Sequence, residues 1–156
     1  FIFHKKIIEE NKNKAVDSIL VVDIPGEFDL ENYGIKNQNI NTISLISPTT
    51  NQDRIKSIAK NSSGFVYYVT LRGVTGASNL NIDEINKNVK EIKKYATVPT
   101  LAGFGIKSPE DARLLSECSD GVIIGSSLVK MIEESSKTKE FDRIGKYITE
   151  IKQAIS

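Results

Sequence analysis

The amino-acid sequence predicts an α/β fold of the TIM (β/α)8 barrel type, with about the last five βα units present in the chain. Short β-branched runs alternate with helical patterns along the 156 residues, and this alternation makes each connection a parallel crossover. Loops rich in Gly, Ser and Thr follow nearly every predicted strand, and barrels of this type build their sites from many strand ends. No low-complexity linker divides the sequence, so we expect residues 1–156 to form a single domain.

An open, doubly wound sheet is the alternative fold for the same elements. The ligand of such a sheet binds at one switch point in the strand order, whereas loops suited to ligand binding are spread along this sequence. A complete barrel takes about 250 residues. We therefore expect the chain to lack about three βα units and to begin inside a larger protein.

The first part of the chain is predicted to form two strands with their helices. Lys5–Lys14 is a charged stretch typical of a surface helix, and Val16–Asp23 is a β-branched run typical of a strand buried on both faces. A helical pattern at Asp29–Gly34 leads to the second strand, Thr42–Ile46. Asn51–Lys60 is predicted to be a helix because its apolar residues share one face. These residues are Ile55, Ile58 and Ala59.

The middle of the chain contains a strand, an unusual loop and a helix. The third strand, Gly64–Thr70, is aromatic and β-branched throughout. The loop Leu71–Ser78 consists largely of small residues and is too long for a tight turn, so we expect a mobile flap that closes over a substrate. Asn81 and Glu84 form a capping-box pattern at the start of the next helix. The apolar residues of this helix are Ile82, Ile85, Val89 and Ile92.

The last part of the chain is predicted to contain two strands and three helices. Thr97–Ala102 is the fourth strand and Val122–Ile124 the fifth. Between them, Ser108 and Asp111 form a second capping box, with Pro109 at the first helical position. The apolar residues of the three helices are Ala112, Leu114 and Leu115, then Leu128, Val129, Met131 and Ile132, and finally Phe141, Ile144, Ile148 and Ile151.

Two consecutive strand ends are predicted to offer backbone N–H groups to one anion. The fifth strand runs through Gly125 and Ser126 into a helix, whose first N–H groups and dipole favour a negative charge. The fourth strand runs into Gly103-Phe104-Gly105. Barrels of this type recurrently bind phosphate at the loops after their last two strands. The alternative for Gly103 and Gly105 is that they are turn glycines with positive φ.

The composition excludes several classes of site. Basic and acidic side chains number 21 and 20, which gives a net charge of +1, so no basic face indicates nucleic acid. One cysteine and one histidine exclude an internal disulfide and a metal site of the usual His/Cys spacing. We expect Cys118 to be a buried, reduced thiol. No apolar run reaches the roughly 18 residues of a membrane span, so we expect a soluble, cytoplasmic protein with no membrane contact.

The sequence resembles the family of tryptophan synthase α subunits. Four stretches carry the resemblance in the family's order, namely Val21–Pro25, Arg72–Ala77, Gly103–Ile106 and Gly121–Ser127. The resemblance covers most of the chain and corresponds to the family's second half. It implies retro-aldol cleavage of indole-3-glycerol phosphate to indole and glyceraldehyde 3-phosphate, a carbon–carbon lyase step in tryptophan biosynthesis.

The resemblance also implies roles for individual residues. Tyr67 corresponds to the tyrosine beside the reacting centre and Thr75 to the threonine that steadies the closed flap, so both are supporting catalytic residues. The family's principal acid/base Glu and its indole-binding Asp have no counterpart in this sequence. The substrate-binding positions are Leu20, Val22, Gly76, Gly103, Phe104, Gly105, Ile123, Gly125 and Ser126. The implied partner is a β subunit in an α2β2 complex; the β subunit carries pyridoxal phosphate, and no cofactor or metal is expected in this chain.

Other readings of the same residues stay open at this point. The chain could belong to another phosphate-binding barrel enzyme that acts on a phosphorylated sugar, or could be a non-catalytic, phosphate-binding regulatory fragment. Tyr67 is equally typical of a buried tyrosine with a satisfied hydroxyl. Asp23 and Glu27 could be a general acid/base pair. Alternatively, Asp23 is a turn residue and Glu27 is solvated.

Overall fold

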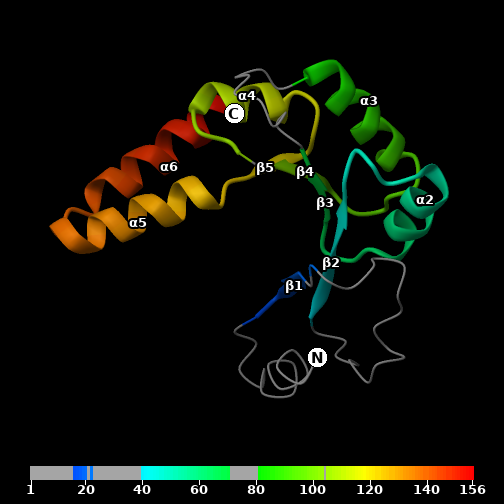
Figure 1. Ribbon diagram of the computed structural model, residues 1–156, viewed down its shortest axis with the longest axis horizontal. Helices are drawn as coiled ribbons and strands as arrows, with labels where there is room; N and C mark the ends of the chain where they lie inside the picture. Colours follow the sequence, from blue (N-terminus) through cyan, green and yellow to red (C-terminus); the bar gives the residue numbers. More distant parts are fainter. Residues whose placement is uncertain (1–15, 21, 23–39, 71–80, 104) are drawn as a thin grey trace.

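The computed structural model describes residues 16–20, 22, 40–70, 81–103 and 105–156. These residues form a curved, five-stranded parallel sheet in the order β1-β2-β3-β4-β5 (Figure 1). The strands are β1 (Ser18–Leu20), β2 (Asn41–Ile46), β3 (Val66–Val69), β4 (Thr100–Gly103) and β5 (Gly121–Ile123). The strand order follows the chain without the reversal of a doubly wound sheet. The predicted barrel type is therefore confirmed over these five strands.

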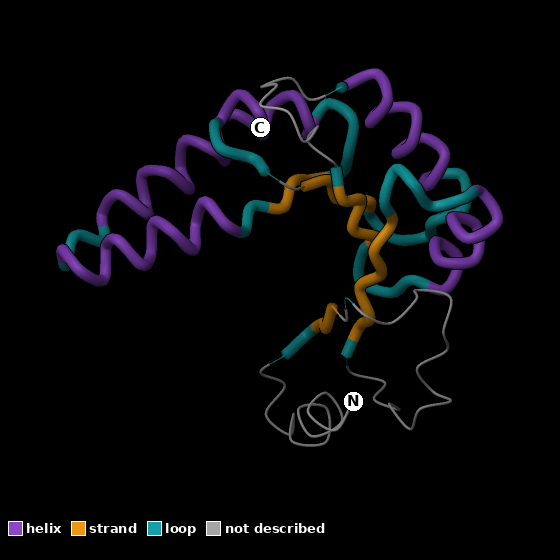
Figure 2. The backbone as a smooth tube through the Cα atoms, in the orientation of Figure 1, coloured by secondary structure: helices purple, strands orange, loops and turns teal. Residues whose placement is uncertain are grey.

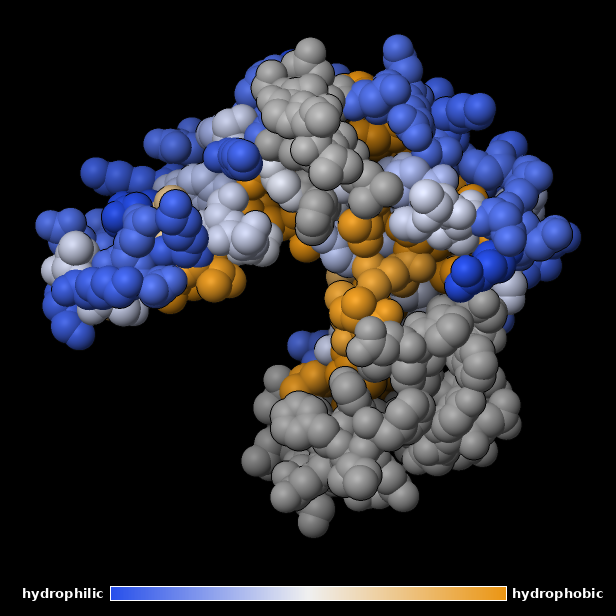
Figure 3. All heavy atoms as spheres, in the orientation of Figure 1, coloured by the Kyte–Doolittle hydropathy of each residue, from blue (hydrophilic) through white to orange (hydrophobic). Residues whose placement is uncertain are grey.

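The helices lie along the convex side of the sheet or extend beyond its last strand. They are α2 (Gln52–Asn61), α3 (Ile82–Lys93), α4 (Pro109–Ser116), α5 (Ser126–Thr138) and α6 (Asp142–Ala154). Figure 2 shows α2, α3 and α4 on the convex side of the strands. The space-filling view in Figure 3 shows an open hollow on the concave side. None of the helices in the described residues is long and apolar enough to cross a membrane. The predictions for Lys5–Lys14, Asp29–Gly34 and Leu71–Ser78 lie outside the described residues.

The two faces of the sheet differ in burial because side chains alternate along each strand. The positions that are buried and matched in register across β2, β3 and β4 are Ser44, Val66 and Thr100, and then Ile46, Tyr68 and Ala102. These positions face the helices, since the Tyr68 hydroxyl accepts a 2.8 Å hydrogen bond from Nδ2 of Asn88 in α3. The half-buried positions between them are Leu45, Tyr67 and Leu101, which line the concave side.

The core lies between the sheet and the outer helices, as the apolar periodicity predicts. Ile55, Ile58 and Ala59 of α2, and Ile85, Val89 and Ile92 of α3, are buried against the strands. Ala112 and Leu115 of α4 are also fully buried, and Leu114 is half-buried. Cys118 is a free, buried cysteine, and burial raises the pKa of its thiol.

Side chains cap the three outer helices. Ser108 and Asp111 form the complete predicted capping box of α4, with Pro109 at the helix start. The box predicted for α3 is only half formed. The Asn81 side chain accepts from the Glu84 N–H at 3.2 Å, but the Glu84 carboxylate accepts from the side-chain amide of Asn81 instead of its backbone.

The bounds of every strand differ from the predicted ones. The first strand is Ser18–Leu20 rather than Val16–Asp23, and the prediction that it is buried on both faces is wrong, because its residues are half-buried or exposed. The second strand begins one residue earlier, at Asn41, and the fifth is shifted by one residue to Gly121–Ile123.

The third and fourth strands differ for reasons of backbone chemistry. The fourth strand begins at Thr100 rather than Thr97, because Pro99 lacks an N–H and contributes only its carbonyl, which accepts from Val66 N at 2.8 Å. The third strand begins at Val66 rather than Gly64, whose φ of +78° is incompatible with an extended strand.

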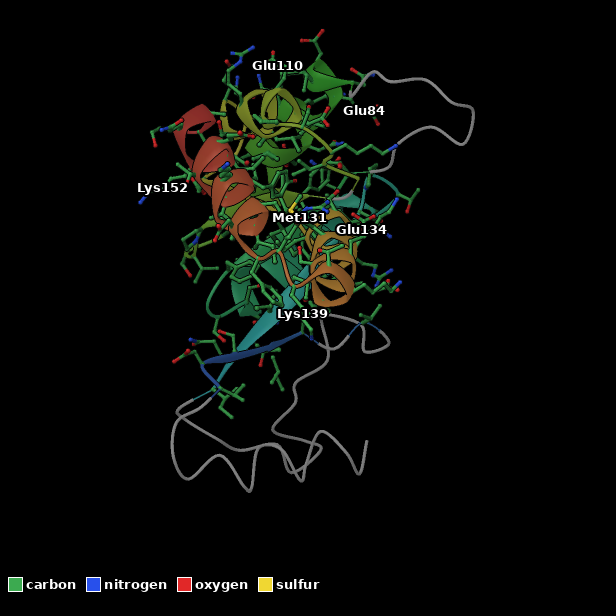
Figure 4. All side chains as sticks on the ribbon, turned by 90° about the vertical axis from the view of Figure 1, so that its left-hand side faces the viewer. Glu84, Glu110, Met131, Glu134, Lys139 and Lys152 are labelled. Carbon is green, nitrogen blue, oxygen red and sulfur yellow. The ribbon has the colours of Figure 1, made fainter. Side chains whose placement is uncertain are left out.

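Helices α5 and α6 form an antiparallel pair that projects beyond the β5 edge of the sheet (Figure 1). Figure 4 looks toward this pair, with Met131 and Glu134 labelled on α5 and Lys152 labelled on α6. Lys139 closes α5 in the left-handed conformation, with φ of 63°. An ion pair of 2.8 Å between Glu134 and Arg143 joins the two helices. Several of the apolar residues that the sequence places on these two helical segments are exposed on the pair. These are Val129 (65% exposed), Ile132 (44%), Phe141 (52%) and Ile148 (50%).

The exposure of these residues has a physical cause. The described residues provide no strand beyond β1 or β5, so the apolar faces next to the β5 edge have no layer to pack on. Figure 3 shows hydrophobic residues along the sheet beside the hollow and a further hydrophobic area on the helix pair.

Candidate active site

The candidate site lies at the carboxyl ends of β3, β4 and β5. The β4–β5 ladder ends with Gly103 opposite Ile123. There is no space for a side chain at position 103, because a Cβ there would lie 2.5 Å from the Ile123 carbonyl oxygen. On the other side, the Gly103 carbonyl accepts hydrogen bonds from the N–H (2.9 Å) and Oγ1 (3.3 Å) of Thr70. A glycine at this position therefore lets the ends of β4 and β5 approach closely, and its carbonyl joins the end of β3 to them.

Helix α5 begins directly after β5 with no side-chain cap. Its N-cap is Gly125, and no side chain among the described residues bonds to its first turn. Gly125 and Ser126 are both exposed. Uncapped N–H groups at the positive end of a helix dipole favour an anion, so this helix start has the electrostatics of a phosphate-binding turn.

The loop that follows β4 lies beside this helix start. Gly105 has φ of +68°, a conformation that favours glycine, so the turn-glycine interpretation holds for Gly105. It does not hold for Gly103, whose role is the close approach to β5. Ile106 is 3% exposed and anchors the loop in the core. Its carbonyl accepts a 2.7 Å hydrogen bond from Oγ of Ser127, the second residue of α5.

The sheet register brings three predicted residues onto the concave face. Tyr67 lies opposite Leu45 in β2, and Leu20 lies opposite Ile43, two residues before Leu45. Ile123 lies opposite Gly103, which is two residues after the concave residue Leu101. Because side chains alternate, Leu20, Tyr67 and Ile123 all face the hollow.

These concave residues differ in exposure and chemistry. Tyr67 and Ile123 are half-buried, Leu20 is 37% exposed, and Val22 beyond the end of β1 is 71% exposed. Burial raises the pKa of Tyr67, so its hydroxyl is protonated at neutral pH and is able to donate as well as accept a hydrogen bond. The face thus combines apolar walls with one polar group.

The amino ends of β4 and β5 carry a separate polar cluster. Asp120 accepts hydrogen bonds from Lys93 Nζ (2.6 Å) and from the Thr100 N–H (2.8 Å). Desolvation alone would raise the pKa of Asp120, but these two hydrogen bonds outweigh it and lower the pKa. Polar groups at this end of a barrel contribute to stability rather than to catalysis.

Thr75, Gly76 and Phe104, together with Asp23 and Glu27, lie outside the described residues. In the part of the chain that is described, no group of three or more His, Cys, Asp or Glu side chains could hold a metal ion.

Two residues of the site, Thr70 and Ser127, were not predicted from the sequence to belong to it. Each forms a hydrogen bond to a residue more than 20 positions away, namely Gly103 and Ile106. A hydroxyl at the carboxyl end of a strand, or in the first turn of a helix after a strand, is the signal that could have indicated them.

Comparison with known proteins places these features in a family. A family model described as Tryptophan synthase alpha chain matches residues 2–156. The tryptophan synthase alpha chain of Neisseria meningitidis serogroup B is 39% identical over 153 residues, covering 97% of this chain and 58% of that protein. The alpha chain of Nitrosomonas europaea is 38% identical over 154 residues, with coverages of 97% and 56%.

Solved structures give the same result. Tryptophan synthase subunit alpha from Campylobacter jejuni has a TM-score of 0.78 at 29% identity, covering 96% of this chain and 60% of that one. A structure of the tryptophan synthase a2b2 complex from Pyrococcus furiosus has a TM-score of 0.77 at 33% identity, with coverages of 94% and 60%. The chain spans more than half, but less than two thirds, of the curated relatives it matches.

Proposed function

Because the chain belongs to the tryptophan synthase alpha chain family, we propose that it carries the substrate-binding half of an active site for indole-3-glycerol phosphate. In the complete protein, that substrate is cleaved to indole and glyceraldehyde 3-phosphate by a retro-aldol step. The observation that carries the proposal is that the glycine turn after β4 meets the uncapped start of α5 at one edge of the sheet.

The phosphate group is proposed to bind between the loop after β4 and the start of α5. We call the residues Gly103, Gly105, Gly125 and Ser126 the phosphate site. The backbone N–H groups at Gly125 and Ser126 lie at the positive end of the α5 dipole, where no side-chain cap occupies them. By the family resemblance, Gly76 and Phe104 complete the binding surface around the glycerol phosphate.

The indole ring is proposed to lie on the concave face. Leu20, Val22 and Ile123 supply apolar contact area there, and the protonated Tyr67 hydroxyl supplies a hydrogen bond close to the reacting atoms. Thr75 is proposed to steady the closed flap over the same substrate. This arrangement orients the indole ring and excludes water from it. Binding residues contribute to the reaction by positioning the substrate in this way.

The proton transfers require carboxylates within hydrogen-bond reach of the substrate. The family resemblance assigns them to a Glu and an Asp that have no counterpart among the positions of this sequence. We therefore propose that further βα units of the same fold supply them and pair with the free edges of β1 and β5. An apolar groove beside β5 suits such packing, and its lining includes Val122, Ile124, Leu128, Tyr147, Ile148 and Ile151.

The family relationship also suggests the setting of the reaction. We propose that the complete protein is a lyase of tryptophan biosynthesis in the cytoplasm and that it associates with a β subunit. The structure from Pyrococcus furiosus is of an a2b2 complex. In this proposal the chain needs no cofactor of its own, and pyridoxal phosphate belongs to the β subunit.

Reconstitution tests the proposed function. This chain is mixed with a fragment that carries the first three βα units of the Neisseria meningitidis relative, and indole release from indole-3-glycerol phosphate is measured. Each fragment alone serves as a control. The mixture should produce indole, and the chain alone should bind without turnover.

Two results would change the proposal. If this chain alone matched the rate of the mixture, the catalytic carboxylate would lie within it, with Asp23 and Glu27 as the candidates. If neither the chain nor the mixture bound indole-3-glycerol phosphate, a barrel specific for a phosphorylated sugar or a regulatory phosphate-binding module would replace the assignment.

A further inference from the structure

The ends of β4 and β5 separate once their ladder stops at Gly103 and Ile123. The loop through Gly105 leads away to α4, while Ile124 and Gly125 lead to α5. The two halves of the phosphate site are carried by these diverging segments. The distance between the loop after β4 and the start of α5 therefore depends on contacts made between these two segments beyond the ladder.

A single side chain makes such a connection. Oγ of Ser127 donates to the carbonyl of Ile106 over 2.7 Å, although the two residues are 21 positions apart in the sequence. Ser127 is half-buried, and Ile106 is held in the core. Among the described residues, this hydrogen bond joins the β4 loop to the first turn of α5. Both ends of the contact are therefore firmly placed.

A serine in the first turn of a helix ordinarily bonds to nearby backbone of its own segment. The Ser127 hydroxyl instead donates its hydrogen bond to the Ile106 carbonyl in the loop after β4. Ser126, the residue before it, is exposed on the phosphate site. The two adjacent serines thus have different surroundings, one facing solvent and the other joining the two segments.

We propose that Ser127 is a positioning residue that sets the separation between the Gly103–Gly105 turn and the start of α5. This inference rests on the proposed function, because it concerns the same phosphate site. Ser127 acts through Ile106 and the backbone of both turns, without contact to the substrate. Loss of its hydroxyl leaves the N–H groups present but no longer held at a fixed spacing, so an anion binds them less well.

The test uses the full chain and inorganic phosphate as the probe, with the Kd measured by titration. Ser127→Ala should raise the Kd about fivefold, a ratio within the range for loss of one hydrogen bond. Ser127→Thr, which keeps the hydroxyl, should restore binding to within about twofold of the original. Hydrogen exchange at residues 105–107 of the free protein should be faster in Ser127→Ala than in Ser127→Thr.

Ser62→Ala is the matched control. Ser62 Oγ donates to the Ile58 carbonyl, also over 2.7 Å, at the end of α2 and away from the phosphate site. This variant should lose stability without any change in the Kd for phosphate. An unchanged Kd in Ser127→Ala, or an equal rise in Ser62→Ala, would overturn the positioning role and leave the phosphate site itself intact. Absence of phosphate binding by the original chain would instead overturn the proposed site, and the inference with it.

Discussion

Replacing Gly103 by alanine should destabilise the fold at the candidate site. The added Cβ would lie 2.5 Å from the Ile123 carbonyl oxygen and 2.9 Å from the Ile123 Cβ. Ordinary contact begins at 3.4 Å, so β5 would have to move by close to 0.9 Å to restore it. The obstacle is backbone of a paired strand, which cannot rotate away as a flexible side chain could.

The expected cost follows from this geometry. Overpacking a well-packed site costs about 1–3 kcal/mol, and the upper half of that range applies because the ladder between β4 and β5 must shift. We expect the free energy of unfolding to fall by about 2–3 kcal/mol. For a chain of this size, that corresponds to a decrease in Tm of about 4–12 °C.

Urea unfolding followed by far-UV circular dichroism measures the change. Gly145→Ala is the control, because a Cβ at Gly145 in α6 meets nothing within 4 Å. Alanine there should stabilise the helix by up to about 1 kcal/mol. If Gly103→Ala cost less than about 0.5 kcal/mol, or behaved like Gly145→Ala, the close approach of the two strand ends would not exist as described.

Three further variants test other parts of the structure. Gly105→Val should strain a turn with φ of +68° and crowd the phosphate site, so that phosphate protects the variant less against urea; undiminished protection would place the site elsewhere. Lys139→Gly should stabilise the protein by about 1 kcal/mol, because Lys139 is left-handed with φ of 63°; a lower midpoint in urea would contradict this. Asp120→Ala should cost about 1 kcal/mol at neutral pH, since its partly exposed hydrogen bonds to Lys93 and Thr100 are lost. The pKa of Asp120 is lowered by folding, so its contribution is present above the unfolded pKa of about 3.9 and disappears as pH falls through the folded value. A cost that stayed constant down to pH 2 would refute that linkage.

The sequence contains enough local information to predict the strands, the outer helices and the glycine turns. The spacing of Ile85, Val89 and Ile92 predicts the face of α3 that is buried in the structure. The pair Ser108-Pro109 predicts the residue at which α4 begins. Parallel strands joined by helices then require carboxyl ends at one edge of the sheet. The location of the proposed phosphate site follows from that requirement together with Gly103 and Gly125.

Long-range packing and register could not be predicted in the same way. Tyr67 and Tyr68 are adjacent, and alternation alone does not say which of them faces the helices. The register and the bond from Asn88 to Tyr68 assign Tyr67 to the concave face. Likewise, the helical spacing around Val129 and Ile148 predicts an apolar face on each helix. The spacing does not say which other element covers that face, and both side chains are exposed.

A phosphate titration of the full chain, followed residue by residue through its backbone amide resonances, tests the substrate-binding half of the site most directly. The geometry predicts that the largest shifts occur at Gly105, Gly125, Ser126 and Ser127, with a common Kd. The capped starts of α2 and α4, at Asn51 and Ser108, should respond little because side chains already occupy their N–H groups. Shifts that are largest at those capped helices, or absent from Gly125 and Ser126, would contradict a phosphate site between β4 and α5.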